Sequence, residues 1–133
     1  MKNQFKMIVT LSVFVASLLL SAFPLTQVAL AKGITARIIL VHSAQYPKAT
    51  GVAKYTTGSQ REFQVEVDHA KVLAGKTLNV FVDGKKVGSM LVNSLGIGHL
   101  NLDTALGNKV PLIKTGSMVV VKFGAVVVIS GTF

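Results

Sequence analysis

Three histidines, His42, His69 and His99, are the residues of this sequence best suited to metal binding or to acid–base chemistry. The chain has no cysteine, so carboxylates would have to complete a metal site, and Asp68 and Asp103 lie near two of the histidines in sequence. Such a site needs three or four converging ligands. No H-x-H or H-E-x-x-H spacing occurs. The pattern favours isolated histidines at strand ends, and we predict no metal and no cofactor.

Three carboxylates, Glu62, Glu66 and Asp68, alternate along one predicted strand. Residues two apart on a strand are about 6–7 Å apart, a separation also found between the two carboxylates of glycosidases. A small β domain offers little depth for a cleft, so a solvated polar face that pairs with lysines on neighbouring strands is the favoured interpretation. The chain also lacks a G-x-S-x-G motif. We therefore predict that the protein is not an enzyme.

Positive charge dominates the sequence, which has a formal net charge of +9. The basic residues are scattered, whereas nucleic-acid binding normally needs a concentrated patch, so no nucleic-acid partner is predicted. The charge fits solvated lysines, with loose attraction to an anionic glycan or lipid as the alternative. For that alternative, the candidate ligand-binding residues are Lys85 and Lys86, which are adjacent, and Arg61.

The N-terminal 31 residues have the pattern of a secretory signal peptide. Lys2 and Lys6 precede an apolar run over residues 7–20, Pro24 follows, and an A-x-A site ends at Ala31. We expect cleavage after Ala31, with an uncleaved anchor as the alternative, although the run is short for a membrane span. The predicted mature chain, residues 32–133, is a single domain with a net charge of +7, exported to the periplasm or the extracellular space, with no membrane span.

The elements that must position these residues are predicted to be strands. The strongest are the two around Gly124-Ala125, a glycine-first turn that places Phe123 opposite Val126. Folded in this way, the hairpin is apolar on both faces, with Val119, Val121 and Val128 on one and Met118, Val120, Val127, Ile129 and Phe133 on the other. The other predicted strands cover residues 33–42, 51–57, 61–68, 77–82, 85–92 and 99–103.

Eight strands in about a hundred residues, with frequent turn signals and no amphipathic helix, predict an all-β fold. The expected architecture is an antiparallel two-sheet sandwich of immunoglobulin-like size, with no substantial helix outside the signal peptide. The Cys…Trp…Cys pattern of true immunoglobulin domains is absent. A closed barrel is the alternative.

The chain from Gly51 onward is similar to a widespread group of small exported bacterial β-sandwich proteins of unassigned function. The resemblance covers about two-thirds of the chain and implies a secreted β-sandwich without a known activity or functional residues. It rests on strand and turn residues: G-V-A-K-Y (51–55), R-E-F-Q-V-E-V-D (61–68), L-A-G-K-T-L-N-V-F-V-D-G-K-K-V-G (73–88), V-P (110–111) and V-V-I-S-G-T-F (127–133).

Self-association is the function for which the sequence gives a positive indication. The strands that are apolar on both faces, residues 38–41 and the C-terminal hairpin, are either central in a sheet, which is favoured, or edges open to strand addition. We therefore expect a secreted, non-catalytic protein with a structural or surface-interaction role, whose partner is itself or an envelope or matrix polymer. A small metal protein or enzyme is the less favoured alternative. The candidate self-association residues are Ile38, Leu40, Ile129 and Phe133.

Overall fold

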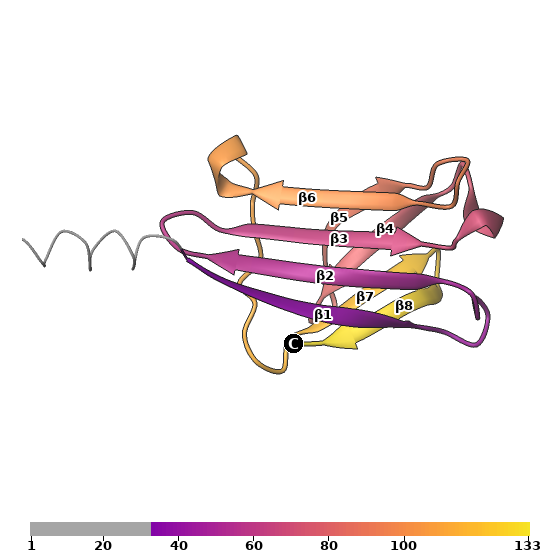
Figure 1. The fold of residues 1–133 in the computed structure, drawn as a ribbon, viewed down its shortest axis with the longest axis horizontal. Helices are drawn as coiled ribbons and strands as arrows, with labels where there is room; N and C mark the ends of the chain where they lie inside the picture. The colour runs from indigo at the N-terminus through magenta and orange to yellow at the C-terminus, as the bar shows by residue number, and fades with distance from the viewer. Residues whose placement is uncertain (1–32) are drawn as a thin grey trace, which may run out of the picture. The chain divides into compact units, whose positions relative to one another are not determined.

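The regular structure consists of eight antiparallel strands and two short 3-10 turns, in a computed structural model that describes residues 33–133 (Figure 1). The predicted signal peptide and its cleavage site lie outside the described residues. Contacts divide the chain after Gly33, and residues 34–133 form one unit that contains every described strand. The elements are β1 (Ile34–His42), β2 (Thr50–Thr57), β3 (Glu62–Asp68), η1 (Lys71–Leu73), β4 (Thr77–Val82), β5 (Lys85–Leu91), β6 (Gly98–Asp103), η2 (Thr104–Leu106), β7 (Met118–Phe123) and β8 (Val126–Thr132).

The predicted all-β class, with eight antiparallel strands, is confirmed. Over residues 33–133, no helix has the length and apolar character needed to cross a membrane. The predicted strands at 61–68, 77–82 and 99–103 agree with β3, β4 and β6 to within one residue at each end.

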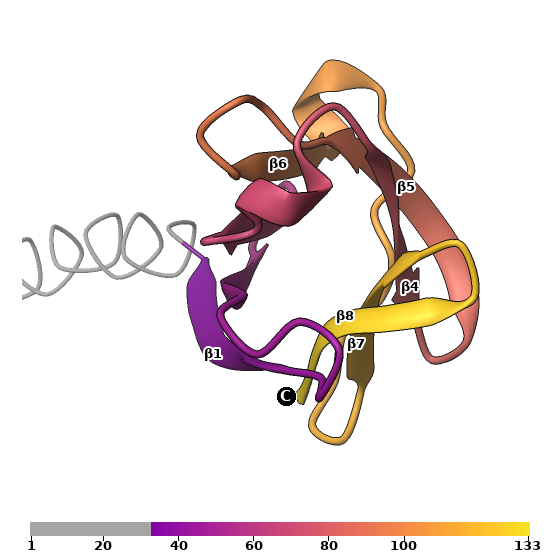
Figure 2. The ribbon, with the colours of Figure 1, turned by 90° about the vertical axis from the view of Figure 1, so that its right-hand side faces the viewer.

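The strands form one continuous sheet rather than two clearly separate ones, in the order β5-β4-β7-β8-β1-β2-β3-β6. Its two four-stranded halves meet where β1 pairs with β8, through Val41 opposite Ser130 and His42 opposite Ile129. Viewed from one end, the strands surround a central space as a nearly closed barrel (Figure 2). Because hydrogen bonds cross the corner between the halves, the described strands form a nearly closed barrel and not clearly the expected two-sheet sandwich.

The core fills the inside of this barrel with side chains from alternate strand positions. β3 shows the alternation most clearly, since Phe63, Val65 and Val67 are fully buried. Inward residues of β4 and β7 face them from the other half, among them Leu78, Val80, Val119 and Val121. Burying a side chain of this size stabilises the fold by about 1.5–3 kcal/mol.

Both predicted tight turns are present. Gly124 has φ 59° and joins Phe123 to Val126 as expected for a glycine-first turn. Asp83 and Gly84 have φ 50° and 80°, so both adopt the left-handed region that a two-residue hairpin turn of this type requires. The Oδ1 atom of Asp83 also accepts a hydrogen bond from the Met118 amide at 2.9 Å, which ties the β4–β5 turn to β7.

A bulge in the C-terminal hairpin changes which side chains face the core. The β7–β8 register shifts after Val121, which lies opposite Ile129, while Lys122 lies opposite Val127. Val128 is thus the extra residue, and both Val128 and Ile129 are fully buried. The alternation of the sequence put Ile129 and Val121 on different faces of the hairpin. Both are instead buried in the core, because one inserted residue reverses the alternation beyond it.

Two glycines allow the halves to approach at the β1–β8 corner. A Cβ on Gly51 would collide with the side chain of Ile129 and would lie 2.8 Å from the carbonyl oxygen of Glu66. A Cβ on Gly131 would lie 3.0 Å from the carbonyl oxygen of Ile39 and 2.9 Å from Cδ2 of Leu40. Close packing of backbone against side chain at these positions requires a residue without a side chain.

Candidate functional site

The three histidines lie at separate places in the fold. His42 ends β1, and its Nδ1 atom lies 3.0 Å from the carbonyl oxygen of Ser43. His69 directly follows β3, and His99 lies on β6 opposite Glu66. In the part of the chain that the structure describes, no three His, Asp or Glu side chains gather into a metal-binding group.

The alternating carboxylates lie on the outer face of the half formed by β1, β2, β3 and β6. A shallow hollow of about 130 Å³ opens there, lined in part by Arg37, Lys54, Glu66 and His99. The expected lysine–carboxylate pairs are absent from residues 33–133, where the one contact of this kind brings His69 Nδ1 to 3.8 Å from Asp68 Oδ1. Lys54 instead lies opposite Gln64 in the β2–β3 register, and the Gln64 amide donates to Glu62.

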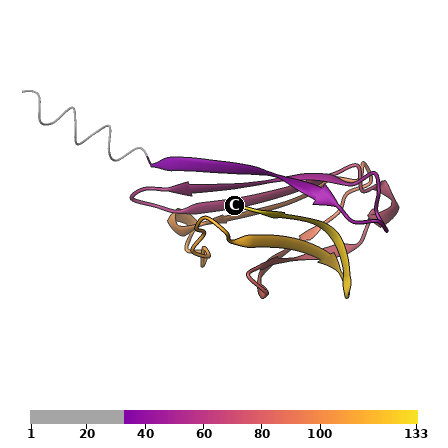
Figure 3. The same ribbon diagram turned by 90° about the horizontal axis from the view of Figure 1, so that it is seen from below.

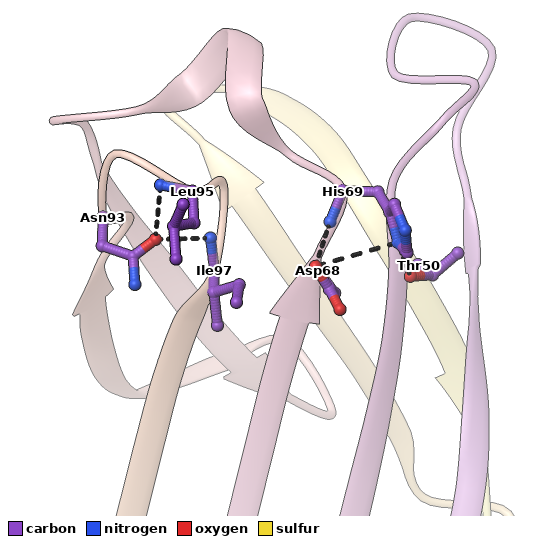
Figure 4. Close-up of polar contacts among 6 residues, drawn as sticks. All are labelled: Thr50, Asp68, His69, Asn93, Leu95 and Ile97. Atoms are coloured by element: carbon purple, nitrogen blue, oxygen red, sulfur yellow. Dashed lines mark hydrogen bonds and ion pairs between the residues drawn. The ribbon is translucent and has the colours of Figure 1, made fainter.

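Thr50, Asp68 and His69 form a small polar cluster at the loop end of β3 (Figure 4). The His69 amide donates to Asp68 Oδ1 at 2.7 Å, and His69 Nδ1 lies 3.0 Å from Thr50 Oγ1. The ring nitrogen that contacts the hydroxyl is also the one nearest the carboxylate, at 3.8 Å. A catalytic triad needs the hydroxyl and the carboxylate on opposite ring nitrogens, so this cluster does not activate Thr50 as a nucleophile. No pattern in the sequence points to Thr50, which only the β2–β3 register brings opposite Asp68.

The candidate ligand-binding residues lie on different elements. Lys85 and Lys86 are exposed at the start of β5. Arg61 directly precedes β3, and its Nη2 atom donates to the carbonyl oxygen of Val110 at 3.3 Å in a half-buried contact. This bond anchors the long segment before β7, so the guanidinium already has a structural partner.

Most of β1 has a paired strand on one side only. Residues 34–40 pair with β2, whereas β8 pairs only with Val41 and His42. Figure 3 shows why, since β1 extends well beyond the C-terminal end of the chain that follows β8. An apolar groove of about 340 Å³ lies beside this free edge, lined by Ile34, Ala36, Ile38, Tyr55, Thr57, Ile113, Lys114, Thr115 and Phe133.

The four candidate self-association residues divide into two pairs. Ile38 and Phe133 are partly buried and line the groove. Leu40 and Ile129 are only 2% and 0% exposed and belong to the core. We therefore correct the set, because buried core side chains offer no surface to a second molecule, and the β7–β8 bulge is what places Ile129 among them.

Comparison with models of known protein families and with curated proteins finds no match for this chain. The similarity to small exported bacterial proteins stays a prediction from the sequence. A function therefore has to be argued from the geometry of residues 33–133.

Proposed function

We propose that this chain is the precursor of an exported, non-catalytic β protein that acts by self-association. The observation that supports this function is the free edge of β1, where residues 34–40 have a strand partner on one side only. An unpaired strand edge is a template for strand addition from another chain. Signal-peptide cleavage after Ala31 would leave this edge two residues from the mature N-terminus.

The side chains of this edge suit a second copy of the same strand. Ile34 is 77% exposed, and Ala36 and Ile38 also line the apolar groove. Single exposed apolar residues are ordinary, but an apolar groove beside a free backbone edge offers both components of strand addition. The backbone provides hydrogen bonds, and the groove takes alternate side chains.

Charge excludes one register for an antiparallel pair of β1 strands, and the apolar residues favour the neighbouring register centred on Ala36. A two-fold axis at Arg37 would place two guanidinium groups directly opposite each other, which is destabilising. An axis at Ala36 places Ile34 opposite Ile38 of the second copy and Thr35 opposite Arg37. The second register stacks the apolar residues on the groove side and separates the charges, and it gives the isologous contact of a two-fold dimer.

The proposal includes a description of the fold as two layers. The two four-stranded halves, β6-β3-β2-β1 and β5-β4-β7-β8, act as the layers of a sandwich joined at one corner. A second copy added at β1 would extend the first layer and leave the other layer in place.

Light scattering after size-exclusion chromatography of residues 32–133 tests the proposal. The expected result is a dimer whose fraction rises with salt, because screening weakens the repulsion between two chains of net charge +7. Ile34→Lys should give a monomer, since a charge on a strand edge opposes pairing. Val72→Lys is the matched control, because Val72 is also 77% exposed but lies on η1. A wild-type monomer at millimolar concentration would exclude this function.

A further inference from the structure

A second pocket lies at the end of the barrel where the β1–β2 and β3–β4 connections meet. Its volume is about 360 Å³, within the range of about 300–1,000 Å³ typical of small-molecule sites. Tyr46, Ala49 and Val72 contribute apolar surface to its wall. This pocket is separate from the groove at β1 and shares no lining residue with it.

Backbone hydrogen bonds hold the walls of this pocket in place. The Ala49 amide donates to the carbonyl oxygen of Tyr46 at 3.1 Å, which closes the β1–β2 connection on itself. On the other wall, the Ala70 amide donates to the carbonyl oxygen of Gly96 at 3.0 Å, so the neighbouring β5–β6 turn supports η1. These bonds hold the backbone of both walls, and the Lys48, Lys71 and Val72 side chains are exposed on it.

The charged groups of the lining are all basic. Lys48 comes from the β1–β2 connection, and His69 and Lys71 come from the β3–β4 connection. No carboxylate is among the lining residues. Asp68, which precedes His69 in sequence, has Oδ1 bonded to the His69 amide at 2.7 Å. Two ammonium groups beside an apolar wall complement a ligand with an anionic head and an apolar body.

The backbone of His69, beside the pocket, is held in an uncommon conformation. Its φ of 56° lies in the left-handed region, which is uncommon for residues other than glycine. Such strained residues cluster at ligand sites, where neighbouring contacts hold them. Here the holding contacts are Asp68 Oδ1 to the amide, visible in Figure 4, and Thr50 Oγ1 to Nδ1. The contact with Thr50 engages Nδ1, so Nε2 is the ring nitrogen left to bind a ligand.

We infer that this pocket binds a small amphiphilic carboxylate. The carboxylate group lies between the Lys48 and Lys71 ammonium groups and accepts from His69, and the apolar body packs against Tyr46 and Val72. The contact with Thr50 Oγ1 orients the His69 ring, so Thr50 is a positioning residue.

Titration of residues 32–133 with decanoate, below its micelle concentration and followed by amide NMR shifts, tests the inference. Every described strand lies within this segment, so it contains the whole fold of residues 34–133. The expected result is saturable binding, with shifts concentrated at residues 46–49 and 69–72. The Lys48→Gln/Lys71→Gln double variant should bind at least tenfold more weakly. Lys85→Gln/Lys86→Gln removes the same charge from another exposed lysine pair and should bind as the wild type does.

Three further arms separate the sources of binding. Decanol, which has the same chain without the charge, should bind at least tenfold more weakly than decanoate, and equal binding would overturn the inference. An equal loss in the Lys85→Gln/Lys86→Gln control would also overturn it, by showing that only net charge matters. Capture on phosphatidylcholine–phosphatidylglycerol vesicles without binding of free decanoate would overturn the inference. It would indicate that the protein binds a lipid surface and not a ligand in this pocket.

Discussion

The side chain of Ile129 occupies the space that a methyl group on Gly51 would fill. Ile129 belongs to β8 and Gly51 to β2, and β1 lies between these two strands in the sheet. The contact therefore reaches across the inside of the corner that joins the two halves of the barrel. It depends on the bulge at Val128, which turns Ile129 inward.

Gly51→Ala should destabilise the fold by about 1–3 kcal/mol, the usual effect of overpacking a core. The new methyl group would meet Ile129 and the carbonyl oxygen of Glu66, and the backbone cannot move away as a side chain can. Urea unfolding of residues 32–133 measures the change. Adding Ile129→Val should recover part of the loss because it removes the Cδ1 atom. Strictly additive effects of the two substitutions would contradict this packing.

Asp83→Ala should cost about 1–2 kcal/mol of stability, from a lost hydrogen bond to the Met118 amide and from a left-handed backbone that alanine disfavours. Asp83→Asn keeps an acceptor oxygen and tolerates the same backbone, so it should lose less than half as much. Thermal unfolding of the two variants compares them directly. Equal losses would mean that the turn geometry does not depend on the side chain.

The left-handed backbone of His69 predicts an order of stability between two variants that both lack the ring. His69→Gly should be more stable than His69→Ala by about 1 kcal/mol, because glycine adopts a φ of 56° without a steric penalty. Chemical denaturation with both variants measures the difference. Equal stability of the His69→Ala and His69→Gly variants would indicate that the loop relaxes once the ring is removed.

The proposed dimer register predicts a specific cross-link. The chain has no cysteine, so Ala36→Cys introduces a single thiol. In the register centred on Ala36, this residue faces its own copy with Cβ atoms about 4.5–5.5 Å apart, close to the separation that a disulfide needs. Mild oxidation followed by non-reducing electrophoresis should give a covalent dimer. Ala105→Cys, at an exposed alanine of η2, should stay monomeric, and equal cross-linking of both would count against the register.

The strands could be predicted from the sequence because their signals are local. The alternation in residues 62–68 predicted a strand, and the turn residues Asp83, Gly84 and Gly124 predicted two hairpin turns. These signals act over two to four residues, and the strand and both turns are confirmed. The face of Ile129 could not be predicted, since a bulge depends on how β8 pairs with β7 and not on β8 alone.

The candidate sites depended on contacts that the sequence does not show. The free edge of β1 arises because β8 diverges after two residue pairs, which no pattern within β1 indicates. The basic pocket joins Lys48 to Lys71 across two separate connections. The sequence therefore does not show that Lys48 and Lys71 line the same pocket. The adjacent pair Lys85-Lys86 lines none of the three pockets described above.

The short junction between β1 and β8 has a consequence for how the protein opens. The two halves are joined there by two residue pairs and the bond from the Ser43 amide to the Val128 carbonyl oxygen, at 2.9 Å. Regions held by few hydrogen bonds open at lower free energy than core ladders. Amide hydrogens at residues 41–43 and 129–130 should therefore exchange with solvent deuterium well before those inside the β2–β3 ladder. The two halves would then separate transiently at the β1–β8 junction, while each half keeps its own hydrogen bonds.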